Sequence, residues 1–229
     1  MRWAETIANV LDIYIPDPQI PLCHSDPFTL LIAVVLSAQC TDARVNQVTP
    51  ALFEQAHTAQ QMASLSVETI AKLIARCGLA KQKAQAIHRL SQELVQRTKG
   101  RVPKTRKALE RLPGVGRKTA SVVQAQAFGI PTFPVDTHIF RSAHRWGLSQ
   151  GKTVRAVETD LKRLFPKTRW NRLHLQIVLF ARQYCPARKH QIGDCLICRL
   201  RARISRQHGD NPSPPRTVRN RSVDRRRST

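Results

Sequence analysis

The chain has 229 residues, enough for one large domain or two small ones with a buried core. Hydrophobic residues make up 41% of it, which excludes an intrinsically disordered chain. Its 38 Lys and Arg residues against 15 Asp and Glu give a formal net charge of +23, and this excess attracts polyanions, so nucleic acid is the expected partner.

Apolar residues recur along the chain at spacings of three and four, and we therefore expect an all-α protein. Asp26 followed by Pro27 is typical of a helix start, and the apolar stretch from about 28 to 38 predicts a buried central helix. Gly78 and Gly129 are each expected to end a helix. The further helices are predicted, in chain order, over about 45–52, 66–78, 87–98, 105–112, 117–128, 137–146, 154–165 and 169–184.

Two segments lack a helical pattern. Segment 129–137 contains two prolines and is expected to be irregular. From about Ser205 the chain becomes basic and proline-rich without apolar periodicity, so 205–229 is predicted to be a disordered basic tail. Such a tail either adds non-specific DNA affinity or is a dispensable solvated extension.

The N-terminus offers no targeting signal. It carries Glu5 and no uninterrupted apolar region, so no secretory signal is predicted. The longest apolar stretch, Phe28 to Leu36, is about half a membrane span. We expect a soluble, cytoplasmic, nucleoid-associated monomer without a membrane partner.

Residues 112–120, Leu-Pro-Gly-Val-Gly-Arg-Lys-Thr-Ala, join two predicted helices by a tight turn. Gly114 and Gly116 can take positive φ and let another backbone approach closely. The amides at the start of the following helix favour an anion, and Arg117 adds a cation. An ordinary helix–helix turn is the alternative, but the basic run after the glycines favours binding of a DNA phosphate.

Asp136 lies between the proline-rich bend and a predicted helix, in Pro-Val-Asp-Thr-His (134–138). Taken alone, it is expected to be a helix cap. Together with 112–120, however, this segment resembles the endonuclease III family of helix-hairpin-helix DNA glycosylases. Leu30 to Asp42, Cys-Gly-Leu at 77–79 and Ala-Phe-Gly at 127–129 extend the resemblance.

The resemblance covers about 27–184 and implies two helical lobes with a DNA-binding cleft between them. A helical barrel over 27–133 would contain the helix-hairpin-helix motif at about 105–128. The second lobe would combine 1–26 with 134–204 and would carry the cysteine-containing loop.

The resemblance also implies base-excision repair by a bifunctional DNA N-glycosylase and AP lyase. Its substrate would be double-stranded DNA with damaged, oxidised pyrimidines or abasic sites, and the damaged nucleotide would be flipped out of the duplex. Lys118 would attack C1′ of the sugar, and the resulting Schiff base permits β-elimination. Asp136 would accept the lysine proton or stabilise the sugar cation. Partial burial and cationic neighbours such as Arg117 would favour the neutral, nucleophilic amine.

Two other functions remain open. A monofunctional adenine-mismatch glycosylase shares this fold, but Lys118 argues against it. A non-catalytic nucleic-acid-binding protein, which net charge alone would favour, does not account for Asp136 standing eighteen residues after Lys118.

The resemblance further places Gln39 and Leu79 in the gap left by the flipped nucleotide. An amide can hydrogen-bond the orphaned base, and an apolar side chain can unstack a base step. Packing of Leu79 in a core is the alternative. Arg141, close to Asp136 and His138 in the sequence, is a candidate either for binding phosphate or for pairing with a carboxylate.

A [4Fe–4S] cluster in this family is usually held by Cys-x6-Cys-x2-Cys-x5-Cys. Here the candidate ligands form the run Cys185-x9-Cys195-x2-Cys198, and Ile204 stands where the fourth cysteine is expected. Because this cluster normally requires four thiolates, its loss or instability is the favoured expectation.

Two alternatives to loss remain. The cluster survives with a non-cysteine ligand, for which His190 and His208 are the nearest candidates, or zinc binds three cysteines and one histidine. In every case Arg188 and Lys189 keep the loop basic and are expected to contact DNA phosphates.

Overall fold

A computed structural model describes residues 2–207, and over that range the chain is helical with no strand, as predicted. The elements are α1 (Arg2–Tyr14), α2 (Pro27–Leu36), α3 (Asp42–Gln55), α4 (Ala59–Ser64), α5 (Val67–Leu73), α6 (Ala80–Thr98), α7 (Arg106–Leu109), α8 (Arg117–Phe128), α9 (Thr137–Arg145), α10 (Val154–Leu164), the short 3-10 helix η1 (Lys167–Arg169), α11 (Trp170–Gln183) and α12 (Leu196–Gln207). None of these described helices is both long and apolar enough to cross a bilayer.

Helix α2 is the central buried helix that the sequence predicts. Asp26 caps it: its Oδ1 accepts hydrogen bonds from the amides of Phe28 (2.7 Å) and Thr29 (3.0 Å), and Thr29 Oγ1 accepts one from the Asp26 amide (3.1 Å). Every residue from Phe28 to Leu36 is buried, which explains why this helix is apolar on all sides.

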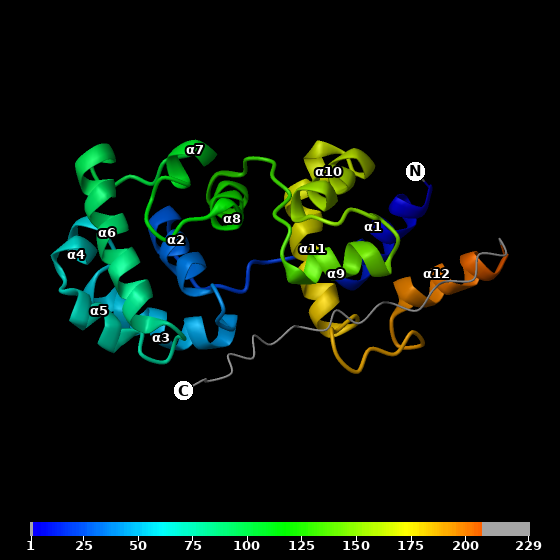
Figure 1. The fold of residues 1–229 in the computed structure, drawn as a ribbon, viewed down its shortest axis with the longest axis horizontal. Helices are drawn as coiled ribbons and strands as arrows, with labels where there is room; N and C mark the ends of the chain where they lie inside the picture. Colours follow the sequence, from blue (N-terminus) through cyan, green and yellow to red (C-terminus); the bar gives the residue numbers. More distant parts are fainter. Residues whose placement is uncertain (1, 208–229) are drawn as a thin grey trace, which may run out of the picture.

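The helices form two lobes, each with its own hydrophobic core (Figure 1). Helices α2 to α8 enclose the first core, and α1 joins α9 to α12 around the second. The chain therefore starts in the second lobe, crosses to the first, and returns through the irregular segment 129–136. Both crossings pass between the two lobes, where the family resemblance implies a DNA-binding cleft.

Asp12 fastens the N-terminal helix to the second lobe. Its carboxylate accepts hydrogen bonds from Arg169 Nη2 (2.6 Å), Arg172 Nε (3.3 Å) and Gln176 Nε2 (2.9 Å). These partners lower the pKa of Asp12 against the opposing effect of its burial. The network joins α1 to α11 although more than 150 residues separate them in the sequence.

One predicted helix end and the predicted start of the tail are wrong. The helix after Ser66 ends at Leu73 and not at Gly78. The turn that follows keeps a three-residue spacing, with the Cys77 amide bonded to the Ile74 carbonyl at 2.8 Å, so its buried residues imitate a helical face. The predicted tail is also interrupted at its start, because α12 continues from Leu196 to Gln207; the rest of the tail, with His208, lies outside the described residues.

Candidate active site

The turn between α7 and α8 is built on a glycine that no other residue can replace without strain. Gly114 has φ +76°, and a Cβ atom there would lie 3.0 Å from Cβ of Ala86 and 3.6 Å from Cγ1 of Val35. Gly116, in contrast, has φ −90° and ψ 178°, so the expected positive φ is wrong at this position. A Cβ on Gly116 would meet nothing within 4 Å, and the surface above the start of α8 is open.

Gly116 is the N-cap of α8 and provides no side-chain acceptor for the first amides of that helix. Those amides and the positive end of the helix dipole are therefore available to an external anion. The guanidinium of Arg117, the first residue of α8, turns away and binds Glu158 Oε2 at 2.8 Å. Glu158 also accepts a hydrogen bond from Lys162 (2.5 Å), and these two cations lower its pKa although burial opposes them.

Lys118 and Asp136 line one cleft between the lobes. Lys118 stands in the first turn of α8 and is exposed, so the partial burial expected for it is not found. Asp136 is half-buried at the start of α9, where its Oδ1 caps the helix by accepting a hydrogen bond from the Ile139 amide at 2.8 Å. Within residues 2–207, Oδ2 of Asp136 has no hydrogen-bond donor, so one carboxylate oxygen is left to act on a ligand.

The cleft has a cavity volume of about 60 Å³ and is partly open to solvent. An ion pair between Arg182 of α11 and Asp42 of α3 bridges the lobes at its wall. The full lining consists of Ile20, Pro21, Leu22, Val34, Ser37, Asp42, Lys118, Val122, Asp136, His174, Leu175, Val178 and Arg182.

His174 of α11 is a cleft residue that the sequence reading missed. It is buried, and its pKa is lowered to about 4, chiefly by burial and further by Lys118, while Asp136 acts in the opposite direction. The imidazole is therefore neutral at neutral pH and adds no second positive charge beside Lys118. The local sequence does not distinguish His174 as a cleft residue, because α11 is buried on most of its surface and His174 is one of many buried positions.

Arg141 helps to hold the end of α11. Its Nη2 donates to the Cys185 carbonyl (3.1 Å) and the Ala181 carbonyl (3.4 Å), and no carboxylate pairs with it in residues 2–207. The neighbouring His138 has a lowered pKa, first because it is partly buried and then because of cations that include Arg182 and Arg141.

Gln39 and Leu79 lie on adjacent loops at the edge of the first lobe. Both have left-handed backbones, with φ of +54° and +59°, which is uncommon for residues other than glycine. A Cβ on Gly78 would be 3.8 Å from the Gln39 carbonyl oxygen, so the two loops touch. Leu79 is 53% exposed, which excludes packing in a core as its role.

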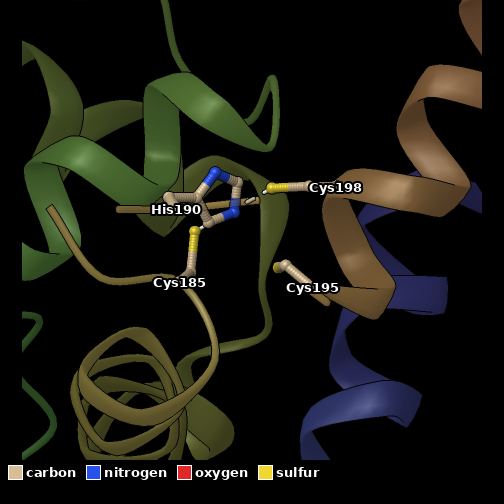
Figure 2. A group of neighbouring side chains, drawn as sticks. All are labelled: Cys185, His190, Cys195 and Cys198. Carbon is tan, nitrogen blue, oxygen red and sulfur yellow. Dashed lines mark hydrogen bonds between the residues drawn. The ribbon is translucent and has the colours of Figure 1, made fainter. Parts of the chain in front are cut away.

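The three clustered cysteines belong to the core of the second lobe. Figure 2 shows them together with His190. Cys185 follows α11, while Cys195 and Cys198 flank the start of α12. His190, from the loop between them, points into the same space, and the four side chains offer ligand atoms that all lie within 4.8 Å of one another. This group can hold a metal ion. Arg188 and Lys189, on the same loop, are exposed.

Ile204, at the position expected for the fourth cysteine, has an aliphatic side chain that offers no ligand atom. It stands six residues beyond Cys198 in the continuous helix α12, which carries it about 9 Å farther along the helix axis at 1.5 Å per residue. A [4Fe–4S] cluster normally takes four thiolates, and the group gathered here offers three thiols and one imidazole.

Comparison with known proteins identifies a family. The model of the HhH-GPD superfamily of base excision DNA repair proteins matches residues 32–167, which include Lys118 and Asp136. The chain is 47% identical over 182 residues to endonuclease III of Treponema pallidum (strain Nichols), and 45% identical over 182 residues to that of Escherichia coli (strain K12). Each match covers 80% of this chain and 86% of the relative. A trapped covalent intermediate of endonuclease III with DNA aligns with a TM-score of 0.81 and 40% identity, over 85% of this chain and 93% of that one.

Proposed function

The chain belongs to the endonuclease III family of HhH-GPD base excision DNA repair proteins, and from this premise we propose that it is a bifunctional DNA glycosylase and AP lyase. Its substrate is double-stranded DNA containing damaged, oxidised pyrimidines or abasic sites. The observation that carries the proposal is the placement of Lys118 and Asp136 in one cleft between the lobes. A binding protein without catalysis would have no need of that pair.

The chemistry follows from these two side chains. Nζ of Lys118 attacks C1′ of the flipped nucleotide, the bond from C1′ to the base breaks, and the departing base takes up a proton. Asp136 accepts the lysine proton or stabilises positive charge on the sugar through its unpaired Oδ2. The sugar ring then opens to a Schiff base. Loss of the C2′ proton breaks the bond from C3′ to the phosphate oxygen, and water releases the enzyme.

We assign the surrounding residues to binding DNA. The first amides of α8, including that of Arg117, bind a phosphate beside Gly114 and Gly116, since the Arg117 guanidinium is held by Glu158. These contacts fix the position of the duplex without reading its sequence.

The touching loops of Gln39 and Leu79 supply the wedge that fills the gap left by the flipped nucleotide. Their left-handed backbones set both side chains on the surface of the first lobe. Arg188 and Lys189 contact phosphates from the second lobe, which extends the basic surface beyond the cleft.

Borohydride trapping tests this function. A duplex with a single thymine glycol or abasic site is incubated with the wild type and with Lys118→Ala in the presence of borohydride, which reduces a Schiff base to a stable adduct. We expect an adduct with the wild type and none with Lys118→Ala. Lys72→Ala, which removes an exposed lysine of α5 outside the cleft, is the matched control and should trap normally.

Asp136→Asn tests the second residue. Asparagine can still cap α9, so the fold should persist while excision slows by about 10²- to 10⁴-fold. A wild type that binds the duplex tightly but forms no adduct would instead establish a monofunctional glycosylase or a non-catalytic binder.

A further inference from the structure

The loop between Cys185 and Cys195 differs from the family spacing in a way that supplies a ligand. It contains nine residues, and His190 stands at its middle, with four residues between it and each cysteine. The complete run is therefore Cys-x4-His-x4-Cys-x2-Cys. Two close ligand pairs joined by a short segment are typical of structural zinc sites.

The separations within the cluster have the size of a mononuclear site. Ligands at about 2.3 Å from a tetrahedral zinc ion lie about 3.8 Å apart. The Sγ atoms of Cys185 and Cys198 are 3.9 Å apart, and no two ligand atoms of the group are separated by more than 4.8 Å. In a [4Fe–4S] cluster each ligand binds a different iron, so its ligand atoms need a wider arrangement than this one.

His190 also has an unexplained polar atom. Its Nε2 is buried and has no hydrogen-bond partner among residues 2–207. A buried nitrogen left unpaired is unfavourable, and a bound metal ion would give it a partner. The three thiols beside it are soft ligands, which favour zinc over magnesium or calcium.

An arginine of α9 holds the loop in the conformation that gathers these ligands. Arg145 donates to the carbonyls of Pro186 (2.6 Å) and Ala187 (3.3 Å) and lies 3.6 Å from the Cys185 sulfur. From the other side, Arg201 of α12 donates to the carbonyls of His144 (3.1 Å) and Arg145 (3.0 Å). The cluster is therefore fixed by contacts outside itself.

We propose that this chain binds one zinc ion through the sulfurs of Cys185, Cys195 and Cys198 and the imidazole of His190, in place of the iron–sulfur cluster. With four protein ligands the site is closed, so the ion is structural. It holds the loop that carries the exposed Arg188 and Lys189.

Metal content is the first test. The full chain is purified anaerobically from cells supplied with iron and zinc, and its zinc, iron and acid-labile sulfide are measured. We expect about one zinc per chain and almost no iron or sulfide. About four iron and four sulfide atoms per chain would overturn the proposal, as would the absence of both metals after incubation with zinc.

Ligand identity is tested with cobalt(II), whose visible spectrum reports the number of bound thiolates. Wild-type protein should show a tetrahedral spectrum with three sulfur ligands. His190→Cys should keep the ion but shift the spectrum to that of four sulfur ligands, and His190→Ala should bind zinc at least tenfold more weakly. His57→Ala, at an exposed histidine of the first lobe, should match the wild type. A cobalt spectrum unchanged in His190→Cys would show that His190 is not a ligand.

Discussion

His174→Gln removes a histidine whose imidazole is buried and uncharged in the folded protein. Burial lowers its pKa from 6.5 to about 4 in the folded chain, with Lys118 contributing and Asp136 opposing. Between these values the unfolded chain binds a proton that the folded chain does not, so the unfolded state gains stability as pH falls. The stability that neutral His174 maintains is fully present above pH 6.5 and is lost progressively as pH falls to about 4.

The size of the effect follows from the shift. At 1.36 kcal/mol per pH unit, the difference between the two values amounts to about 3 kcal/mol of unfolding free energy. For a chain of this size that corresponds to a loss in melting temperature of about 6–12 °C. Carboxylates also titrate in this range, so the quantity of interest is the difference between the wild type and His174→Gln.

The assay is urea or thermal unfolding at a series of pH values from about 7 to about 4. Wild type should lose about 3 kcal/mol more than His174→Gln over that range, whatever their relative stabilities at neutral pH. His57→Gln, which replaces an exposed histidine, serves as the control and should follow the wild type. Parallel curves for wild type and His174→Gln would refute the reasoning.

Three further substitutions separate stability from function. Gly114→Ala should lower the free energy of unfolding by about 1–2 kcal/mol, because φ is +76° and the new Cβ would lie 3.0 Å from that of Ala86. An unchanged urea unfolding midpoint would contradict this. Glu158→Gln should lower the free energy of unfolding by about 1–3 kcal/mol, because it weakens the charged hydrogen bonds from both Arg117 and Lys162; an unaltered melting temperature would show that these contacts do not contribute to stability. Leu79→Ala should leave stability within about 0.5 kcal/mol, since the side chain is 53% exposed, yet slow base excision about tenfold or more; excision at the wild-type rate would exclude it as a wedge.

Features encoded within a few residues were predictable from the sequence. The cap of Asp26 on α2 and the end of α8 at Gly129, with φ +64°, depend on hydrogen bonds and backbone preferences inside a single turn. The motifs around Lys118 and Asp136 carried the family resemblance because each is a continuous segment. The same local reasoning failed after Leu73, where a tight turn keeps the apolar spacing of a helix.

Contacts between residues that are far apart in the sequence could be known only from the tertiary structure. Arg117 and Glu158 are 41 residues apart, so no local pattern could show that this arginine is held by a carboxylate of the other lobe. The burial of His174 beside Lys118 likewise depends on how α11 packs against the first lobe. The sequence supplied a cluster of three cysteines with His190 nearby, but only the folding of the loop shows that His190 lies beside them. Hydrophobic periodicity and helix caps depend on interactions within one or two turns, so the sequence shows them directly. Ion pairs, burial and metal-ligand sets depend on distances between segments, and these distances are fixed only when the lobes have packed.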